Sequence, residues 1–191
     1  IDDTVAPVCI TKDITIPVNS TITANDIDNG STDNCGIDTI TLDNLSFDCS
    51  NVGANTVTLT VTDVNGNAAT DTAIVTVQDV TDPTVITQDI TITLNGSGQA
   101  VITSGMINNG SFDNCGIASY TLSKTAFDCS NVGANTVTLT VTDVNGNSST
   151  ATAVVTVLGE TTTSSITSVP TSSVYTGGVA TNLFLGYGAQ S

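Results

Sequence analysis

The sequence FDCSNVGANTVTLTVTDVNGN occupies residues 47–67 and returns unchanged at residues 127–147. From Val57 to Val61 apolar residues alternate with threonines, and the pair Asn65-Gly66 separates this run from a second alternating run. Such alternation is typical of a strand with one buried and one solvated face. Asn-Gly favours a two-residue type I′ turn, because both residues tolerate positive φ. Each copy, together with the alternating run that follows it, is therefore predicted to form a β-hairpin.

The repeat divides the 191-residue chain into two modules. The text Asp-Asn-Cys-Gly also recurs, at residues 33–36 and 113–116, and Pro7 recurs as Pro83. The offset grows from 76 to 80 between these landmarks, which places extra residues of the second copy in the turn 95–98. The expected organisation is the end of a preceding repeat with its linker (1–6), two repeats (7–79 and 80–158), a Thr/Ser-rich linker (159–173) and a Gly/aromatic tail (174–191).

Short alternating runs bounded by turn residues predict the strands of each module. They lie at 13–18, 37–42, 55–63 and 68–77, and at 89–94, 99–103, 117–122, 135–143 and 148–157. The predicted fold class is all-β, with two tandem immunoglobulin-like β-sandwich modules followed by a C-terminal extended tail. The chain has no Trp, so it lacks the Cys-Trp-Cys pattern of true immunoglobulin domains and the name describes architecture only.

The charge of the chain excludes several classes of function. The formal net charge is −16, with two lysines, no Arg and no His. Binding to nucleic acid needs Lys and Arg on the phosphates, and an anionic membrane surface would repel this chain. No run of residues is apolar enough to predict a membrane span. Without His, a Ser-His-Asp or Cys-His catalytic arrangement is impossible, so we expect no enzymatic activity.

The cysteines predict disulfides and hence an oxidising, extracellular location. Cys35 and Cys49 are 14 residues apart, as are Cys115 and Cys129. This repeated spacing predicts one local disulfide in each module, worth about 3 kcal/mol in the chain-entropy model. Zinc is the alternative, but each module has too few thiols and no His for four ligands. Cys9 has a valine as its counterpart, which favours a buried thiol that packs as a small apolar residue.

Acidic and amide side chains recur at the predicted turns and predict calcium as a cofactor. The turn 63–67 carries one carboxylate and two amide oxygens, and Asp3 or Asp79 is placed to close a site at a module junction. Oxygen ligands of this kind are those that calcium prefers. The alternative is that these are ordinary turn residues. The candidate calcium ligands are Asp28, Asp33, Asn34, Asp63, Asn65, Asn67, Asp79, Asp113, Asn114, Asp143, Asn145 and Asn147.

The recurring patterns Asp-Asn-Cys-Gly, Phe-Asp-Cys-Ser-Asn-Val-Gly and Val-Thr-Asp-Val-Asn-Gly-Asn, followed by a proline linker, resemble hyalin-type (HYR-like) repeats. They are most similar to the repeats in very large surface proteins of gliding Bacteroidetes, and the resemblance covers residues 1–158. The tail resembles the segment that follows such repeats in gliding adhesins of the SprB type. The resemblance implies a surface adhesin that is exported by type IX secretion and moved along the cell by the gliding machinery.

Taken together, these observations predict a non-enzymatic stalk segment of a large extracellular filamentous adhesin, attached to the outer membrane at the cell surface. The expected partners are neighbouring repeats of the same chain, surface proteins of the secretion or gliding machinery that contact the tail, and surface polysaccharide. The alternative is a module whose own loops bind carbohydrate or protein. The tail at 174–188 is rich in apolar residues yet too short for a core of its own, so we expect it to dock on a partner or to begin a further domain.

Overall fold

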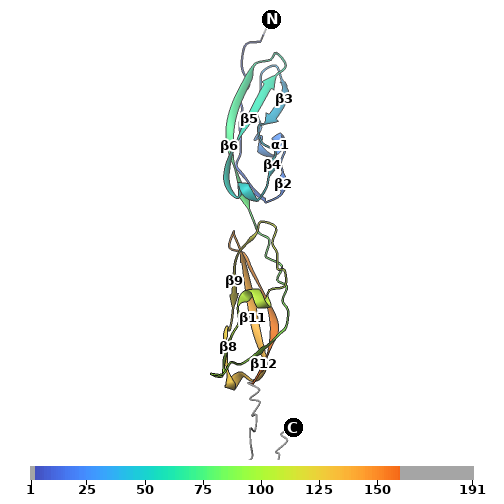
Figure 1. Ribbon diagram of the computed structural model, residues 1–191. Helices are drawn as coiled ribbons and strands as arrows, with labels where there is room; N and C mark the ends of the chain where they lie inside the picture. Colours follow the sequence, from blue (N-terminus) through green and yellow to red (C-terminus); the bar gives the residue numbers. More distant parts are fainter. Residues whose placement is uncertain (1–2, 160–191) are drawn as a thin grey trace, which may run out of the picture. The chain divides into compact units, whose positions relative to one another are not determined.

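The computed structural model describes residues 3–159, whose regular secondary structure consists mostly of β-strands (Figure 1). The expected linker and tail beyond residue 159 lie outside the described residues, and so does the predicted docking of the tail. The first module consists of β1 (Ile14–Pro17), β2 (Ser20–Thr21), α1 (Ala24–Ile27), β3 (Ile37–Leu42), β4 (Ser46–Phe47), η1 (Cys49–Asn51), β5 (Gly53–Asp63) and β6 (Ala68–Gln78). The second consists of β7 (Ile90–Thr93), β8 (Gln99–Val101), α2 (Ser104–Ile107), β9 (Ile117–Leu122), β10 (Ala126–Asp128), η2 (Cys129–Asn131), β11 (Gly133–Asp143) and β12 (Ser148–Leu158).

Both modules share one sheet topology. Four strands form the larger sheet in the order β1-β6-β5-β3, with the equivalent order β7-β12-β11-β9 in the second module. The long hairpin β5–β6 is antiparallel and pairs Val57 with Ala73, whereas β1 runs parallel to β6. A second sheet of two strands, β2-β4 or β10-β8, completes each module. This confirms the predicted fold class of tandem immunoglobulin-like β-sandwich modules.

The core of each module lies between its two sheets. In the first module Val57, Leu59 and Val61 of β5 are fully buried, together with alternate residues of β6, and they cluster with Ile22 and Phe47 beside the small sheet. The intervening threonines face outward, as the alternation predicts. Burying one such side chain stabilises the fold by about 1.5–3 kcal/mol. The second module repeats this cluster around Leu139.

The tip of the long hairpin differs from the prediction. Gly66 has a positive φ of 90°, but Asn65 does not, so the turn is not of type I′. Instead Gly66 N donates to Asp63 O, and Asp63 N donates to Asn67 O, which closes a longer loop before β6 begins at Ala68. A type I turn followed by a left-handed glycine has this form. The longer loop leaves Asp63 free to organise the turn with its side chain.

The predicted strands all exist, but several short elements were not predicted. β2 and β4 have two residues each, and α1 and α2 have four. The extra residues of the second copy lie in the turn between β7 and β8, where Asn95 Oδ1 accepts hydrogen bonds from Ser97 N and Gln99 N. No helix among residues 3–159 is long and apolar enough to cross a membrane.

Candidate functional site

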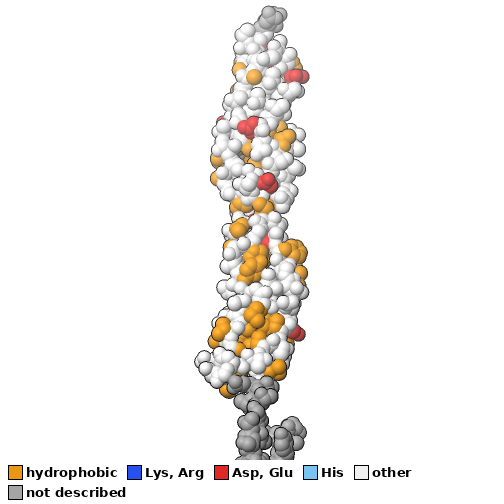
Figure 2. Space-filling model, viewed as in Figure 1, with side chains coloured by type: hydrophobic (Ala, Val, Ile, Leu, Met, Phe, Trp, Pro, Cys, Tyr) orange, Lys and Arg blue, Asp and Glu red, His pale blue; other side chains and the backbone are white. Residues whose placement is uncertain are grey.

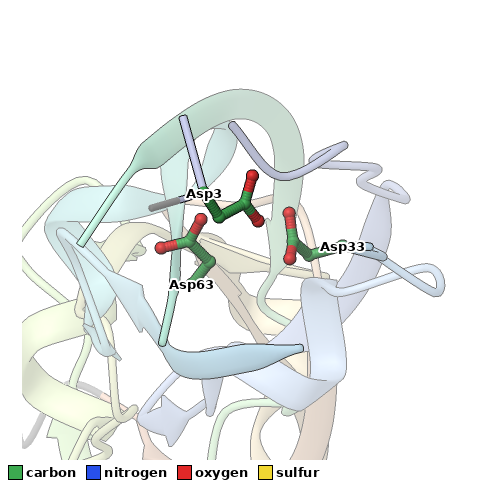
Figure 3. A group of neighbouring side chains, drawn as sticks. All are labelled: Asp3, Asp33 and Asp63. Atoms are coloured by element: carbon green, nitrogen blue, oxygen red, sulfur yellow. The ribbon is translucent and has the colours of Figure 1, made fainter. Parts of the chain in front are cut away.

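Three carboxylates meet at one end of the first module. Asp63 is the last residue of β5, Asp33 lies in the loop between α1 and β3, and Asp3 lies in the N-terminal segment. Each offers an oxygen within 4.8 Å of the oxygens of the other two. Figure 3 shows the three side chains close together on separate segments of the chain. We call this group the first acidic cluster.

Hydrogen bonds fix two of these carboxylates in place. Asp33 Oδ2 accepts from the backbone N–H groups of Cys35 and Gly36, at 2.7 and 3.0 Å. Asp63 Oδ1 accepts from the backbone N–H groups of Asn65 and Asn67, both at 2.8 Å, and Asp63 Oδ2 accepts from Asn67 Nδ2 at 2.7 Å. The sequence motifs Asp-Asn-Cys-Gly and Asp-Val-Asn-Gly-Asn therefore form turns that each hold a carboxylate at the cluster.

Two carboxylate oxygens of the first acidic cluster are buried and lack partners. Asp3 Oδ1 accepts from Val5 N at 3.0 Å, but Asp3 Oδ2 is buried without a hydrogen bond. Asp33 Oδ1 is likewise buried without a partner. A buried carboxylate oxygen is unfavourable unless it is paired with a donor or a cation. The cluster thus presents unused oxygen atoms to one another.

The second module repeats this arrangement in its second acidic cluster, formed by Asp79, Asp113 and Asp143. Asp79 comes from the segment after β6 and is only 8% exposed, and Asp143 at the end of β11 is 2% exposed. Asp79 Oδ1 accepts from Thr81 N at 3.1 Å, whereas Asp79 Oδ2 is buried with no partner. One nearly buried, unpartnered carboxylate oxygen therefore faces two further carboxylates.

The amide of Asn114 lies beside the second acidic cluster. With its nitrogen turned toward Asp113, it donates to both carboxylate oxygens at 3.2 Å. Asn114 therefore supports the Asp113 carboxylate as a hydrogen-bond donor.

The protonation behaviour of these carboxyls follows their hydrogen bonds. Burial acts to raise the pKa of Asp63 and Asp143, but the hydrogen bonds from Asn67 and Asn147 and from the turn N–H groups outweigh it, and both pKa values are lowered. The hydrogen bond from the Val5 N–H lowers the pKa of Asp3. These side chains are therefore negatively charged at neutral pH.

No cation of the described residues neutralises either acidic cluster. Lys12 and Lys124 are the only lysines of the chain, and neither forms a hydrogen bond with a cluster carboxylate. The face drawn in Figure 2 likewise shows scattered acidic side chains and no Lys or Arg. Each cluster therefore concentrates three carboxyl groups in a small volume without a neighbouring cation among the described residues.

The oxygen spacing can be tested against metal chemistry. Two ligand oxygens of one calcium ion, each about 2.3–2.6 Å from it, lie no more than about 5 Å apart. The spacing of 4.8 Å or less within each cluster satisfies this limit. Zinc prefers nitrogen and sulfur ligands, and the clusters offer carboxylates and amides instead. The donor set fits a hard divalent cation.

The structure brings together only part of the predicted ligand set. Asp33, Asp63, Asp79, Asp113 and Asp143 belong to the two acidic clusters, as does Asp3, the counterpart of Asp79 at the repeat offset.

The remaining candidates play other roles. Asp28 lies outside both clusters and accepts from Ser31 N. Asn65 contributes its backbone N–H rather than an oxygen, as does Asn145. Asn67 and Asn147 donate their amide N–H groups to the cluster carboxylates. Asn34 Nδ2 lies 3.4 Å from Cys35 Sγ.

The predicted local disulfides are wrong. Cys49 forms its disulfide with Cys115 of the other module, with a Cα–Cα distance of 5.3 Å, and Cys35 and Cys129 are free thiols. The reason is geometric. Cys49 lies just before the start of β5, whereas Cys35 lies beside Asp63, the last residue of β5. The 11 residues of β5 span about 33 Å, so the two cysteines lie at opposite ends of the strand. A repeated spacing cannot distinguish pairing within a copy from pairing between copies.

The disulfide is part of a wider contact between the two modules. Cys115 packs against the hydrophobic core of the first module, and Cys49 Sγ lies 3.4 Å from Asn114 O. Asn147 Nδ2 donates to Asp79 O at 3.2 Å. This hydrogen bond links the β11–β12 hairpin to the connecting segment between the modules, residues 79–89. The second acidic cluster therefore lies directly beside the covalent junction.

Cys9 is half-buried, as a small apolar residue would be, and burial raises the pKa of its thiol.

Fold and site together define a class of protein: tandem immunoglobulin-like β-sandwich modules, each with an acidic cluster at the end of its long hairpin. No protein-family model and no curated protein matches the chain. Similar solved structures include human protocadherin-24 EC1-2, with 14% identity and a TM-score of 0.44 over 82% of this chain and 100% of that one. Human mucin-like protocadherin EC1-2 has 16% identity and a TM-score of 0.43 over 81% of this chain and 98% of that one. An endo-fucoidan hydrolase from glycoside hydrolase family 107 has 16% identity and a TM-score of 0.32, and this chain spans 29% of its length. These likenesses are of architecture.

Proposed function

We propose that this chain is a load-bearing, non-enzymatic stalk segment of a large extracellular filament. On this proposal it belongs to a surface adhesin of the gliding-motility type, exported by type IX secretion and anchored at the cell surface. The observation that carries the load-bearing role is the Cys49–Cys115 disulfide, which joins the two modules in addition to the peptide backbone. The near-identical hairpins of the modules further support a repeated mechanical role, because binding sites usually diversify their loops.

The disulfide changes the path along which tension travels. A pull on the two chain ends reaches Cys49, passes through the two sulfur atoms and leaves from Cys115. The 65 residues between these cysteines (50–114), including the hairpin β5–β6 and the connecting segment, then carry no tension. The chain cannot be drawn out through this part unless the disulfide breaks. The extension of the unfolded chain is therefore limited covalently.

Single-molecule stretching of the full chain tests the load-bearing role. With the chain held at its two ends, the fully unfolded length is expected to grow on reduction by about 220–240 Å, the extended length of a chain segment with the 66-residue separation of the two cysteines. The variant C115S should show the longer length without reductant. The variant C35S removes an unpaired cysteine and serves as the matched control, with an unchanged length. An equal length before and after reduction would contradict the proposal.

We further propose that each acidic cluster binds calcium and thereby stiffens the module end. The support is the buried, unpartnered Asp79 Oδ2, held within reach of the Asp113 and Asp143 carboxylates. A cation at this point would pair with the unused oxygen and offset the repulsion of three carboxylates. It would also tie the connecting segment, which carries Asp79, to the hairpin and loop of the second module.

Thermal unfolding of the variant D79N tests calcium binding. The wild-type chain is expected to melt at a higher temperature in millimolar calcium than in EDTA, with a gain near 2.7 kcal/mol for each occupied cluster when calcium is a hundredfold above its dissociation constant. D79N should stabilise or leave unchanged the chain in EDTA, because it removes one repelling charge, yet lose the part of the calcium gain that the second acidic cluster supplies. D38N removes a charge from the exposed face of β3 and should keep the full gain. A wild-type melting temperature that is equal in EDTA and calcium would rule the site out.

A further inference from the structure

Each module carries the same two junction cysteines. One lies beside the acidic cluster, as Cys35 or Cys115, and the other lies on the short 3-10 helix before the long hairpin, as Cys49 or Cys129. The disulfide joins the helix-type cysteine of the first module to the cluster-type cysteine of the second. This leaves one cysteine of each type over, Cys35 and Cys129, and both are exposed thiols.

The cluster-type thiol that remains free has the same local structure as the paired one. Asp33 Oδ2 accepts from Cys35 N and Gly36 N, at 2.7 and 3.0 Å. Asp113 Oδ2 accepts from Cys115 N and from the following glycine, at 2.8 and 3.2 Å. The turn that presents Cys115 to its partner is therefore already formed around Cys35.

The helix-type cysteines match in the same way. Asp48 caps the helix of Cys49 by accepting from Ser50 N at 2.8 Å, and Asp128 caps the helix of Cys129 by accepting from Ser130 N at 2.9 Å. In both helices the asparagine at the end accepts from the backbone N–H of the capping Asp, at 3.0 Å. The backbone around Cys129 therefore has the same hydrogen bonds as the backbone around Cys49, which forms the disulfide.

We propose that Cys35 and Cys129 are the two open ends of a disulfide ladder that staples each repeat to the next. Cys35 pairs with the helix-type cysteine of a module placed before it. Cys129 pairs with the cluster-type cysteine of a module of another copy, because residues 159–191 of this chain contain no cysteine. The partner in both cases is a second copy of this kind of module. The inference rests on the proposed stalk role, and it names the partner that the stalk requires at each junction.

The bond forms by two successive thiol–disulfide exchanges. A low-molecular-weight disulfide such as oxidised glutathione accepts the electrons. One cysteine thiolate attacks it and forms a mixed disulfide with release of one glutathione thiol. The second cysteine thiolate then attacks the protein sulfur of that mixed disulfide and releases the second glutathione thiol. Two protein thiols are oxidised to one disulfide, and one glutathione disulfide is reduced to two thiols.

A fusion of two copies recreates the junction and tests the pairing. Residues 1–158 of one copy are joined to residues 3–191 of a second, so that Val157-Leu158-Asp3 replaces the native Val77-Gln78-Asp79. The first copy carries C35S and the second carries C129S, so that each peptide mapped at the junction comes from one copy only. Residues 1–160 form one compact unit of the chain, so the first copy retains both modules. After equilibration with oxidised and reduced glutathione, free thiols are alkylated and the peptides are mapped by mass spectrometry.

The expected result is a new disulfide between Cys129 of the first copy and Cys35 of the second, formed intramolecularly. Alkylation of these two positions should fall at least tenfold below their level in the single 191-residue chain, which is the reference. The fusion carrying C129S in the first copy should leave Cys35 of the second copy fully alkylated. The fusion carrying C9S removes a cysteine away from the junction and should pair like the parent.

Two outcomes would overturn the proposal: full alkylation of both positions, or pairing of Cys129 with any cysteine other than Cys35 of the second copy. The stretching experiment keeps the two proposals separate. A reduction-dependent length in the single chain together with free junction thiols in the fusion would reject the ladder and leave the load-bearing role intact. A ladder without any effect of reduction on length would reject the load-bearing role.

Discussion

At the scale of single residues, an aspartate carboxylate can organise a turn with one oxygen and keep the other for a different partner. Asp33 and Asp79 do this: one oxygen accepts backbone N–H groups and the other is buried and unpartnered. The first role is visible in the sequence, because Asp at a turn followed by Gly is a common signal. The second is not, since it depends on which turns meet in space. The sequence therefore predicted most of the acidic residues of the clusters but not how they are grouped.

Amide side chains show the same limit. An asparagine in a turn offers an oxygen and a nitrogen, and the sequence does not say which one faces a neighbouring carboxylate. Asn67 and Asn147 were predicted as oxygen ligands, but each donates its N–H group to Asp63 or Asp143, at 2.7 and 2.8 Å. They therefore support the carboxylates of the clusters instead of adding ligands to them.

The capping aspartates of the 3-10 helices predict how stability depends on pH. Hydrogen bonds from the Ser50 hydroxyl and N–H lower the pKa of Asp48, and Ser130 does the same for Asp128. A carboxyl with a lowered pKa in the folded state stabilises the fold above its unfolded-state pKa, near pH 4, and this contribution is lost as the pH falls through the folded-state pKa. Urea unfolding in EDTA should therefore show stability that falls from pH 5 towards pH 2.

Replacing both caps isolates their share of this pH dependence. The double variant D48N/D128N keeps a side-chain oxygen for each helix but removes the titrating groups. It is expected to lose less stability on acidification than the wild type. Asp38 lies in β3, outside the 3-10 helices. The control variant D38N should therefore lose stability on acidification as steeply as the wild type. Equal slopes for the double variant and the wild type would show that the caps do not contribute.

At the scale of elements, the long hairpin determines the module. Its period-two pattern and Asn-Gly signal were sufficient to predict β5 and β6, because each strand has 11 residues and one face that is buried over several alternate positions, from Val57 in β5 and from Ala73 in β6. β2 and β4 were not predicted, since two residues are too few to show a period. Their pairing is determined by the tertiary contact of Phe47 with the core. Strand length thus separates what the sequence shows from what only packing decides.

The hairpin turn offers a direct test of backbone strain. Gly66 has a φ of 90°, and a Cβ added there would meet nothing within 4 Å. G66A should therefore destabilise the first module through its backbone alone, by about 1–2 kcal/mol. G105A in α2, where φ is ordinary and the nearest atom lies 3.9 Å away, is the matched control and should be neutral or slightly stabilising. Chemical unfolding of the two variants would decide, and equal stability would contradict the strain argument.

At the scale of the whole described chain, two modules are joined by more than their connecting segment. The connection combines the Cys49–Cys115 disulfide, the contact of Cys115 with the first core and the hydrogen bond from Asn147 to Asp79 O. None of these could be predicted from one module alone. The duplicated cysteine spacing suggested closed loops within each module, whereas the structure uses the same residues to connect neighbours.

The parallel pairing of β1 with β6 determines how a module responds when its ends are pulled apart. Ile14 to Pro17 lie alongside Val75 to Gln78 in the same direction, and β7 pairs in the same way with β12. When the Cys49–Cys115 disulfide is reduced, β6 and β7 lie on the path of tension. Because the chain then enters at the start of β1 and leaves at the end of β6, opposite pulls slide these two strands along each other. The hydrogen bonds between them are then loaded in shear and must yield together, whereas a hairpin pulled open at one end unzips one bond at a time. Each module thus has a mechanical clamp where the chain enters and leaves it.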